Sequence, residues 1–491
     1  MDGIVESIQT LRRELSLPRG LVAVIALVFL YLLSNKYRRG LSSLPGPRLA
    51  AYSSLWRYLD VRGGQAHQTA IRLHRKYGEI VRIGPNHVSV SDPREIKKIY
   101  GLKSGYTKSA FYPIQSITWK GKVEVNLFGT RDEAYHRQLK KPVANAFSLT
   151  SLLSNEAAVD SCTKLLLEKL SYFADGRQLF DLGEWIQFYT FDVMGELTFA
   201  QKLGFLDNGG DVDGMIQTIE DLLVYASQIG QIPEWHKFLM GNPLLPIFIP
   251  NMEGWNKVLT FTLKAVNAVM GGEVECMGDM LSKWFATKLA NPEKISTRDI
   301  VVHLSTNVFA GSDTTAIALR ATLYHLLKNP VKLQKLVKEI DDAAAGGLLS
   351  SPISFRESTT HLPYMQAVLK EGLRIHPSVG LLLERHVPSE GATICGRHIP
   401  GGTIVGHWKN GSKTQLWLLQ ANLLLSFFEI YNADWKVPQR AITLLSGTAK
   451  LAHEAYSTMK GLSKSNYKDW VCLESTVRQV QQVESQLEAE L

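Results

Sequence analysis

Residues Ala310-Gly311-Ser312-Asp313-Thr314-Thr315 place a polar group in the middle of a long apolar segment. From Thr297 to Leu327, apolar residues recur at three and four spacing, which predicts a central buried helix. Polar groups are costly there unless they have partners or a function. A threonine hydroxyl beside a carboxylate can relay protons to a bound molecule, and Gly311 lets a ligand approach the backbone. The alternative is a helix irregularity with threonine hydroxyls bonded to the preceding turn.

A second polar pair follows downstream. Glu371 and Arg374 lie three residues apart on a segment that ends at His376-Pro377, where proline stops a helix. Apolar residues flank the pair on both sides. A buried ion pair is expensive unless further partners satisfy it, so we expect this pair to hold local structure rather than to carry out chemistry.

The composition is that of a large globular chain. Its 491 residues are 45% hydrophobic and 20% charged, which is ample for a large core. No linker-like stretch follows the amino-terminal segment, so one large domain is expected there. The net charge of +8 comes from scattered Lys and Arg without a nucleic-acid motif, so no nucleic-acid partner is expected. The cysteines form no CxxC or CxxH pair and indicate neither a disulfide framework nor a zinc site: Cys162, Cys276, Cys395 and Cys472.

The amino-terminal segment predicts an uncleaved membrane anchor. Leu21–Leu33 is wholly apolar, and a helix of this length spans about 20 Å of a hydrocarbon layer of about 30 Å. Including Leu17 and Pro18, with Arg19 snorkelling, lengthens the span to about seventeen residues. The downstream flank is basic, with Lys36, Arg38 and Arg39. Basic flanks favour the cytosolic side for the following domain. A buried helix is the alternative.

The rest of the chain predicts a small amount of sheet followed by many helices. Leu44-Pro45-Gly46-Pro47-Arg48 is a stiff turn suited to a hinge, and Tyr77–Pro93 has the alternation of a hairpin. Pro243–Pro250 is an apolar loop that contacts either the bilayer or the core. Helical spacing is found in Ala134–Phe147, Leu182–Phe199, Met215–Ala226, Thr297–Leu327 and Tyr364–Ile375.

The two polar motifs, in this order and at this separation, resemble the cytochrome P-450 family of haem-thiolate monooxygenases. The resemblance runs from about Leu44 to about Gly406, and Phe191-Asp192-Val193-Met194-Gly195-Glu196 is most similar to the fungal branch typified by pisatin demethylase. It implies a P-450 fold, mainly α with small β-sheets (α+β), that is incomplete after about residue 406. The implied regions are an anchor with its flank (1–43), the monooxygenase-like domain (44–406) and an atypical tail (407–491).

The resemblance assigns roles to the first motif. It implies that Asp313 and Thr314 assist O–O cleavage by delivering protons over the face of the haem. It also implies that Ala310 and Gly311 shape the oxygen pocket. Substrate specificity would then lie in loops around Phe111–Val123 and Asp213–Pro250.

The resemblance also implies residues that hold the haem and the core beneath it. His136, Lys140 and Arg385 correspond to propionate partners in the family, where cations meet carboxylates. Lys140 stands where the family has Arg, and a lysine lacks the bidentate fork. Glu371 and Arg374 would hold the core beneath the haem.

The family's metal ligand has no counterpart in this chain. The family continues with a Pro-x-Arg meander and a Phe-x-x-Gly-x-Arg-x-Cys-x-Gly loop, whose thiolate binds iron. Cys472 is the only cysteine after Gly406, and every flanking position of that loop fails around it, so no metal ligand is assigned and Cys472 is a poor candidate. Pro438-Gln439-Arg440 matches the meander over two residues only. Cys395 lies in a predicted hairpin and is expected to be a small core residue.

Two interpretations of function follow. In the first, the chain is a haem-dependent monooxygenase, anchored in the endoplasmic reticulum membrane with a cytosolic catalytic domain and an altered carboxyl end. It would oxidise an apolar small molecule of secondary-metabolite or xenobiotic type with O2 and electrons from an NADPH-dependent reductase. In the second, it is a haemless, inactive product of a truncated or mis-spliced gene. A membrane-bound interaction protein is disfavoured because the Asp313-Thr314 pair then lacks a structural reason.

The tail supports no further assignment. Its apolar run Leu416–Tyr431 is interrupted by polar residues, so a second membrane span is not expected there. The chain ends with apolar residues at helical spacing among Gln and Glu.

Overall fold

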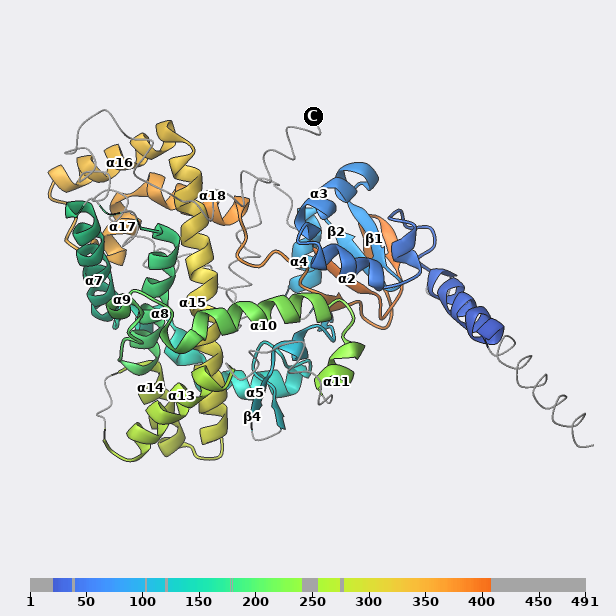
Figure 1. Ribbon diagram of the computed structural model, residues 1–491, viewed down its shortest axis with the longest axis horizontal. Helices are drawn as coiled ribbons and strands as arrows, with labels where there is room; N and C mark the ends of the chain where they lie inside the picture. Colours follow the sequence, from blue (N-terminus) through green and yellow to red (C-terminus); the bar gives the residue numbers. More distant parts are fainter. Residues whose placement is uncertain are drawn as a thin grey trace, which may run out of the picture. The chain divides into compact units, whose positions relative to one another are not determined.

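A computed structural model describes residues 21–37, 40–101, 104–119, 122–176, 178, 180–240, 255–273 and 278–407. The chain divides into two compact units. Unit 1 comprises Met1–Ile114, Tyr225–Gly241 and Leu381–Asn410, and unit 2 comprises the remaining segments. Both units combine helices with short sheets, and the whole is the mainly α fold of the predicted class (Figure 1).

Unit 2 is built around one long helix, α15 (Thr297–Leu327), which begins with a capping box between Ser296 and Asp299. It contacts α8, α13, α14, α16 and α18 (Figure 1). A short ribbon, β4 (Ile117–Trp119) and β5 (Lys122–Glu124), also belongs to unit 2. The other helices are α5 (Glu133–Val143), α6 (Leu149–Leu153), α7 (Glu156–Asp175), α8 (Leu182–Phe199), α9 (Phe205–Asn208), α10 (Met215–Ile229, in unit 1 from Tyr225), α13 (Trp255–Met270), α14 (Met280–Ala290), α16 (Pro330–Ala345), α17 (Phe355–His361) and α18 (Pro363–Ile375).

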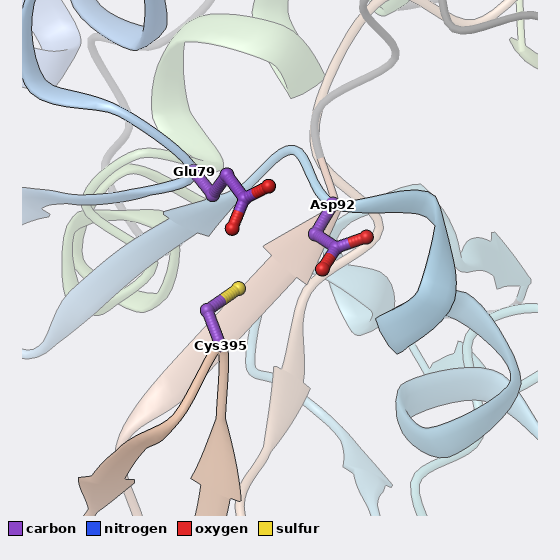
Figure 2. A group of neighbouring side chains, drawn as sticks. All are labelled: Glu79, Asp92 and Cys395. Carbon is purple, nitrogen blue, oxygen red and sulfur yellow. The ribbon is translucent and has the colours of Figure 1, made fainter.

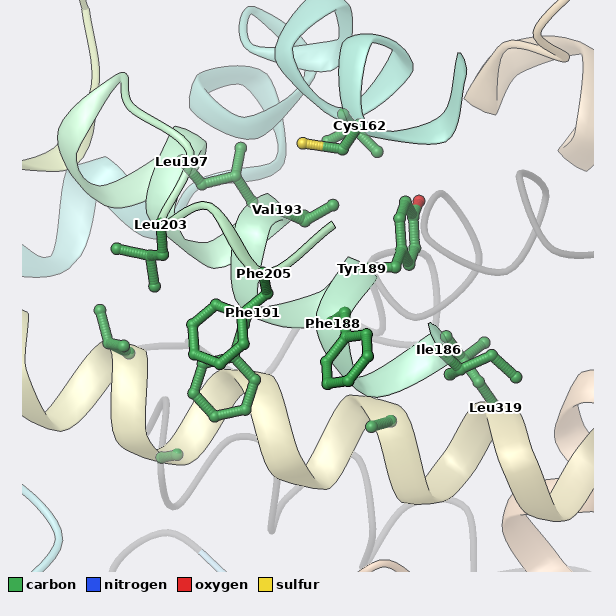
Figure 3. Close-up of a cluster of buried hydrophobic side chains, with 14 of the residues drawn as sticks. Cys162, Ile186, Phe188, Tyr189, Phe191, Val193, Leu197, Leu203, Phe205 and Leu319 are labelled. Carbon is green, nitrogen blue, oxygen red and sulfur yellow. The ribbon is translucent and has the colours of Figure 1, made fainter. Parts of the chain in front are cut away.

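The core of unit 2 lies between α8 and α15. Phe191 on α8 packs on Phe205 of α9, with ring centroids 4.6 Å apart, and Phe188 lies beside them (Figure 3). Cys162 of α7 is buried in the same cluster, where it acts as a small apolar side chain. Because α8 is buried nearly all round, it lacks the polar face of a surface helix and must pack on several neighbours.

Unit 1 contains a five-stranded sheet in the order β1-β2-β9-β6-β3. β1 (Ile80–Gly84) and β2 (His87–Val90) form the antiparallel hairpin that the sequence predicts, and β2 pairs in parallel with β9 (Ile404–His407). A second hairpin joins β7 (Ala392–Ile394) and β8 (Arg397–Ile399), as predicted around Cys395. The remaining elements are β3 (Thr107–Lys108), β6 (Arg385–His386), α2 (Leu55–Arg62), α3 (Ala66–Tyr77), α4 (Ile96–Tyr100) and α11 (Glu234–Met240).

A helix over residues 21–37 presents exposed apolar side chains, and Arg82 holds its carboxyl end. The buried Arg82 guanidinium donates to the carbonyls of Asn35 and Lys36, each at 2.9 Å, which satisfies groups that a helix end leaves unpaired. Among the described residues, no helix combines the length and the apolar character needed to cross a membrane. The predicted anchor extends to Leu17 and Pro18, which lie outside the described residues.

The periodicity predictions agree closely with the helices. Leu182–Phe199 and Thr297–Leu327 are confirmed with the same bounds, as α8 and α15. Ala134–Phe147 corresponds to α5 and the 3-10 turn Ala144–Phe147 that follows it. Several predicted features lie outside the described residues: Pro243–Pro250, Cys276, Leu416–Tyr431, Pro438-Gln439-Arg440 and Cys472.

Candidate functional site

The Thr314 hydroxyl is hydrogen-bonded within its own helix. Its Oγ1 donates to the carbonyl of Ala310 at 2.9 Å, and the Thr314 carbonyl accepts from Ser378 Oγ at 2.7 Å. This is the back-bonded alternative that the sequence left open. The hydroxyl oxygen keeps its lone pairs as acceptors, so the geometry is compatible with proton transfer as well as with a purely structural role.

Asp313 belongs to a polar chain that links α15 to α8. Its Oδ1 accepts from Gln187 Nε2 at 3.2 Å, and Gln187 Oε1 in turn accepts from Arg320 Nη2 at 2.5 Å. Only 8% of Asp313 is exposed. Burial raises the pKa of its carboxyl group, while Arg320 and the Gln187 hydrogen bond oppose that shift. A carboxyl with a raised pKa can hold and release a proton closer to neutral pH than an ordinary aspartate can.

Gly311 lies against Met194 of α8 in the structure. A side-chain carbon at this position would lie 2.6 Å from Met194 Cε and 2.8 Å from its sulfur. The missing side chain therefore makes room for Met194 of α8. Ala310 is likewise buried, in the core of unit 2. Helix packing involves both small residues, and their role in shaping an oxygen pocket stays a prediction.

His303 is a buried residue of this helix face that sequence reasoning missed. It precedes Ala310 by two helical turns and Thr314 by about three, so the three residues share one face of α15. Its ring meets Trp284 edge to face, with centroids 6.0 Å apart. Burial, with a smaller contribution from the charge of nearby His136, lowers the pKa of His303 to about 4, and the charge of Asp299 opposes this shift. A histidine in an apolar run, two turns before Ala310, was the signal available in the sequence.

We expect His303 to make unit 2 sensitive to acid. Its folded pKa of about 4 lies below the value of 6.5 for an ordinary histidine, so the folded state loses stability as pH falls from 6.5 towards 4. At pH 5 the loss amounts to about 2 kcal/mol. Urea unfolding at pH 7.5 and pH 5 measures it, and His303→Phe should reduce the difference between the two pH values. His361→Phe, on a partly exposed histidine, is the control and should leave the difference unchanged.

The predicted propionate partners of unit 2 lie on α5. His136 and Lys140 are four residues apart on one face of this helix, and both are partly buried. Asp132 caps the helix by accepting from the backbone amides of Ala134 and Tyr135, at 2.8 and 3.0 Å. The proximity of His136 to His303 brings this face of α5 to α15.

Glu371 and Arg374 form the predicted pair on α18. Arg374 Nε and Nη2 donate to the two carboxylate oxygens of Glu371, each at 2.6 Å, in bidentate geometry. The side chains are 54% and 24% exposed, so the pair is not the buried one that the apolar flanks suggested. The hydrogen bond from Arg374 lowers the pKa of Glu371. The apolar neighbours at 369 and 373 are buried instead, because they face the rest of unit 2.

Arg385 of unit 1 lies between two tyrosine rings. Its guanidinium carbon is 5.4 Å from the ring centroid of Tyr100 and 5.0 Å from that of Tyr112, and it donates to the Tyr112 hydroxyl. Lys108 on β3 lies directly opposite Arg385 on β6 in the sheet register. Both cations are buried, with 3% of Lys108 and 8% of Arg385 exposed. Two buried cations at adjacent positions favour an anion beside them. Lys108 had no signal in the sequence, because its strand is two residues long.

A cluster of Glu79, Asp92 and Cys395 has metal-ligand atoms within 4.8 Å of one another (Figure 2). Arg94 already forms an ion pair with the Asp92 carboxylate of this cluster. The Arg94 Nε donates to both oxygens of Asp92 at 2.9 Å, and its Nη2 lies 2.7 Å from Oδ2. Burial raises the pKa of the Cys395 thiol to about 12, so the sulfur is protonated at neutral pH. The cluster is therefore a salt-bridged corner of unit 1.

Comparisons with known proteins define the class of enzyme. The family model described as Cytochrome P450 matches residues 45–412. A cytochrome P450 monooxygenase of Aspergillus terreus is 39% identical over 404 residues, which cover 79% of this chain and 80% of that protein. Pisatin demethylase of Fusarium vanettenii is 34% identical over 396 residues, with 78% and 74% covered. The chain therefore belongs to the cytochrome P450 family and is of the P450 monooxygenase type.

The family implies haem, and the described residues fit it in part. The buried cations Lys108 and Arg385 suit a propionate carboxylate. The described residues do not provide a thiolate ligand for the iron. Cys162 is buried in the apolar core, which raises the pKa of its thiol, and Cys395 is also a high-pKa thiol. Neither provides the thiolate that the family uses, and Cys472 lies outside the described residues.

Proposed function

We propose that the chain represents a membrane-anchored, haem-dependent monooxygenase that oxidises an apolar small molecule of secondary-metabolite or xenobiotic type. The observation that carries the proposal is the family match over residues 45–412, which includes the Asp313-Thr314 pair. Haem, when bound, would supply oxygen activation, with electrons from an NADPH-dependent reductase. The family relation and the apolar character of the anchor segment support this assignment.

The proposed chemistry gives this chain's residues four tasks. Thr314 would hold a proton at its Oγ1, and Asp313 would replenish it, which its raised pKa favours. His136 and Lys140 on α5, and Arg385 on β6, would bind propionate carboxylates, with Lys108 as an additional partner. Ala310 and Gly311 would shape the oxygen pocket. Glu371 and Arg374 would hold the surrounding chain in place through their bidentate pair.

The proposed location is the endoplasmic reticulum membrane with the catalytic domain in the cytosol. The helix over 21–37 presents apolar side chains outward, and its fixed attachment through Arg82 supports an anchor that continues towards the amino terminus. Basic residues after the helix favour the cytosolic side for the rest of the chain.

A second candidate is a catalytically inactive, haemless product of a gene for such an enzyme. One observation favours it: the sequence after Gly406 lacks the Phe-x-x-Gly-x-Arg-x-Cys loop, and the family match ends at residue 412. The two candidates share the fold of residues 45–406 and differ in whether iron is bound.

A chimera tests the proposed function. Residues 1–406 are joined to the corresponding carboxyl-terminal part of the Aspergillus terreus relative, and the product is loaded with haem and reduced with carbon monoxide. We expect a thiolate-type shift of the Soret band, because the graft supplies the missing ligand. Absence of haem binding by a folded chimera would reject a haem-binding role for residues 1–406.

In this chimera we expect Thr314→Ala to lower the product formed per NADPH consumed at least about tenfold, because a positioned proton donor is lost. Ser312→Ala is the matched control, since Ser312 also bonds back to its own helix, at 2.9 Å to the Val308 carbonyl. The carbon monoxide spectrum of both variants should stay unchanged. Equal coupling in the two variants would contradict a proton-delivery role for Thr314.

A further inference from the structure

Gln187 on α8 lies between a carboxyl group and a guanidinium group of α15. Its side chain is buried, with 3% of the residue exposed. Its Nε2 donates to Asp313 Oδ1 at 3.2 Å, and its Oε1 accepts from Arg320 Nη2 at 2.5 Å. The amide therefore uses its donor end for the carboxyl group and its acceptor end for the guanidinium.

Arg320 fixes which end of the amide faces Asp313. A guanidinium group only donates hydrogen bonds, so the amide oxygen must face it and the amide nitrogen must face the carboxyl group. The guanidinium is itself held, because its Nε donates to the Gly183 carbonyl at 2.7 Å. Gly183 leaves room for this contact, since a side-chain carbon there would lie 3.3 Å from Arg320 Nε. Two hydrogen bonds of Arg320 to α8 thus set the orientation of Gln187.

This orientation makes the two carboxyl oxygens of Asp313 unequal. The amide nitrogen of Gln187 donates and does not accept, so a proton on Oδ1 would face another donor. The buried amide N–H would then lose its acceptor, which is costly. A proton on Oδ2 leaves the hydrogen bond from Gln187 to Oδ1 intact. Protonated Asp313 therefore carries its proton on Oδ2.

Charged groups also surround this chain of hydrogen bonds. Glu220 of α10 acts electrostatically on both Asp313 and Arg320, and Asp181 and Glu184 at the start of α8 act on Arg320. Burial raises the pKa of Asp313, while the charge of Arg320 and the hydrogen bond from the α8 amide lower it. The amide thus affects how tightly the proton is held as well as which oxygen holds it.

We propose that Gln187, oriented by Arg320, is a positioning residue that confines the transferable proton of Asp313 to Oδ2. The proposal rests on the proposed function, in which Asp313 replenishes the proton of Thr314. It adds two residues to that task, one on α8 and one on α15, and all four residues belong to unit 2.

NMR of the full-length, haem-free chain, with the aspartate carboxyl carbons labelled isotopically, tests the positioning without any turnover. Asp313→Asn identifies the Asp313 signal, which is then followed against pH. Gln187→Met removes the donor at similar side-chain length, and we expect the pKa of Asp313 to rise by about one unit. Asn307→Leu is the matched control, because Asn307 is also a buried amide that links α15 to α8, through Thr198 at 2.9 Å. It should leave the pKa of Asp313 unchanged.

Arg320→Lys separates the orientation of the amide from the charge beside it. The substitution keeps a positive charge and removes the guanidinium fork. It should raise the pKa of Asp313 by a smaller amount than Gln187→Met does, because the amide is no longer held with its nitrogen towards the carboxyl group. Combined with Gln187→Met, it should add no further rise, since both substitutions act through the same amide.

The pH profile of the chimera with the relative's carboxyl end links the positioning to proton supply. In Gln187→Met, the pH at which product formed per NADPH declines should move upward by the same amount as the pKa of Asp313. Below that pH the coupling should fall about twofold, because the proton then occupies either oxygen. Asn307→Leu should keep the profile of the unaltered chimera.

Each outcome decides a point. A pKa of Asp313 that Gln187→Met leaves unchanged, or that Asn307→Leu raises equally, would overturn the role of Gln187. A raised pKa with an unchanged pH profile would overturn its part in proton supply. A folded chimera that binds no haem rejects the proposed function instead, and the NMR titration does not depend on it. Circular dichroism and urea unfolding confirm that each variant is folded, and if Gln187→Met is not, Arg320→Lys still decides the proposal.

Discussion

Reduced in the presence of carbon monoxide, the purified 491-residue chain is expected to show no thiolate-type shift of its Soret band. The shift requires a cysteine thiolate on the haem iron. Cys162 and Cys395 are thiols whose pKa values burial raises, and both are tied into the fold of their units. The flanks of Cys472 match the family's ligand loop at no position. The expected result is the complete absence of the shifted Soret band by which active haem-thiolate monooxygenases are recognised.

Two controls make this expectation decisive. Cys472→Ser should leave the spectrum of the chain unchanged, whereas the chimera with the relative's carboxyl end should show the shift. A clear shift in the unaltered chain that Cys472→Ser abolishes would identify Cys472 as the ligand. It would also remove the argument for an inactive product.

Asp192→Ala is expected to lower the free energy of unfolding by about 4 kcal/mol, because it leaves several buried backbone N–H groups without an acceptor. The Asp192 carboxylate is fully buried on α8. Its Oδ1 accepts from the amides of Gly204 and Phe205 at 2.8 and 3.1 Å, and its Oδ2 accepts from Leu206 at 2.9 Å. Asp192 therefore holds the start of α9 against α8. Urea unfolding followed by circular dichroism measures the loss.

Asp211→Ala is the matched control for this substitution. Asp211 also accepts from two backbone amides, those of Ile216 and Gln217 at 2.9 and 3.1 Å, but it is exposed. Water can replace its hydrogen bonds, so about 1 kcal/mol is expected there. Asp192→Asn retains one acceptor and should fall between the two. An Asp192→Ala loss no larger than that of Asp211→Ala would show that burial of the carboxylate is not the cause.

The stretch around Asp192 illustrates what a resemblance leaves unexplained. Phe191-Asp192-Val193-Met194-Gly195-Glu196 pointed to the fungal branch, and the match with pisatin demethylase confirms that relation. The structure adds the physical reason for its residue types. Asp192 caps the start of α9, Met194 fills the space at Gly311, and Gly195 lets the chain near Leu203 approach α8, where a side-chain carbon would lie 2.5 Å from the Gln201 carbonyl.

The local sequence pattern was sufficient to predict the helices and the hairpin. It was insufficient to predict the side-chain contacts of the candidate site. Helical spacing located α8 and α15, because their apolar periodicity extends over many turns. The hairpin β1–β2 followed from alternation and a Pro-Asn turn. The hydrogen-bond partner of Asp313, Gln187, is more than a hundred residues away in sequence, on α8, and spacing on α15 contains no information about it. For the same reason the spacing on α15 does not show that Gly311 lies against Met194 of α8.

The sequence by itself determined the family, the order of the long helices and the absence of the ligand loop, since these depend on residues that are neighbours in the chain. Only the tertiary structure decided which polar groups are satisfied, which cations meet and which histidine is buried. Lys108 and Arg385 become a pair through strand register, and His303 acquires its lowered pKa through burial by other helices. Such properties depend on distance and desolvation in the folded chain, and one-dimensional spacing encodes neither.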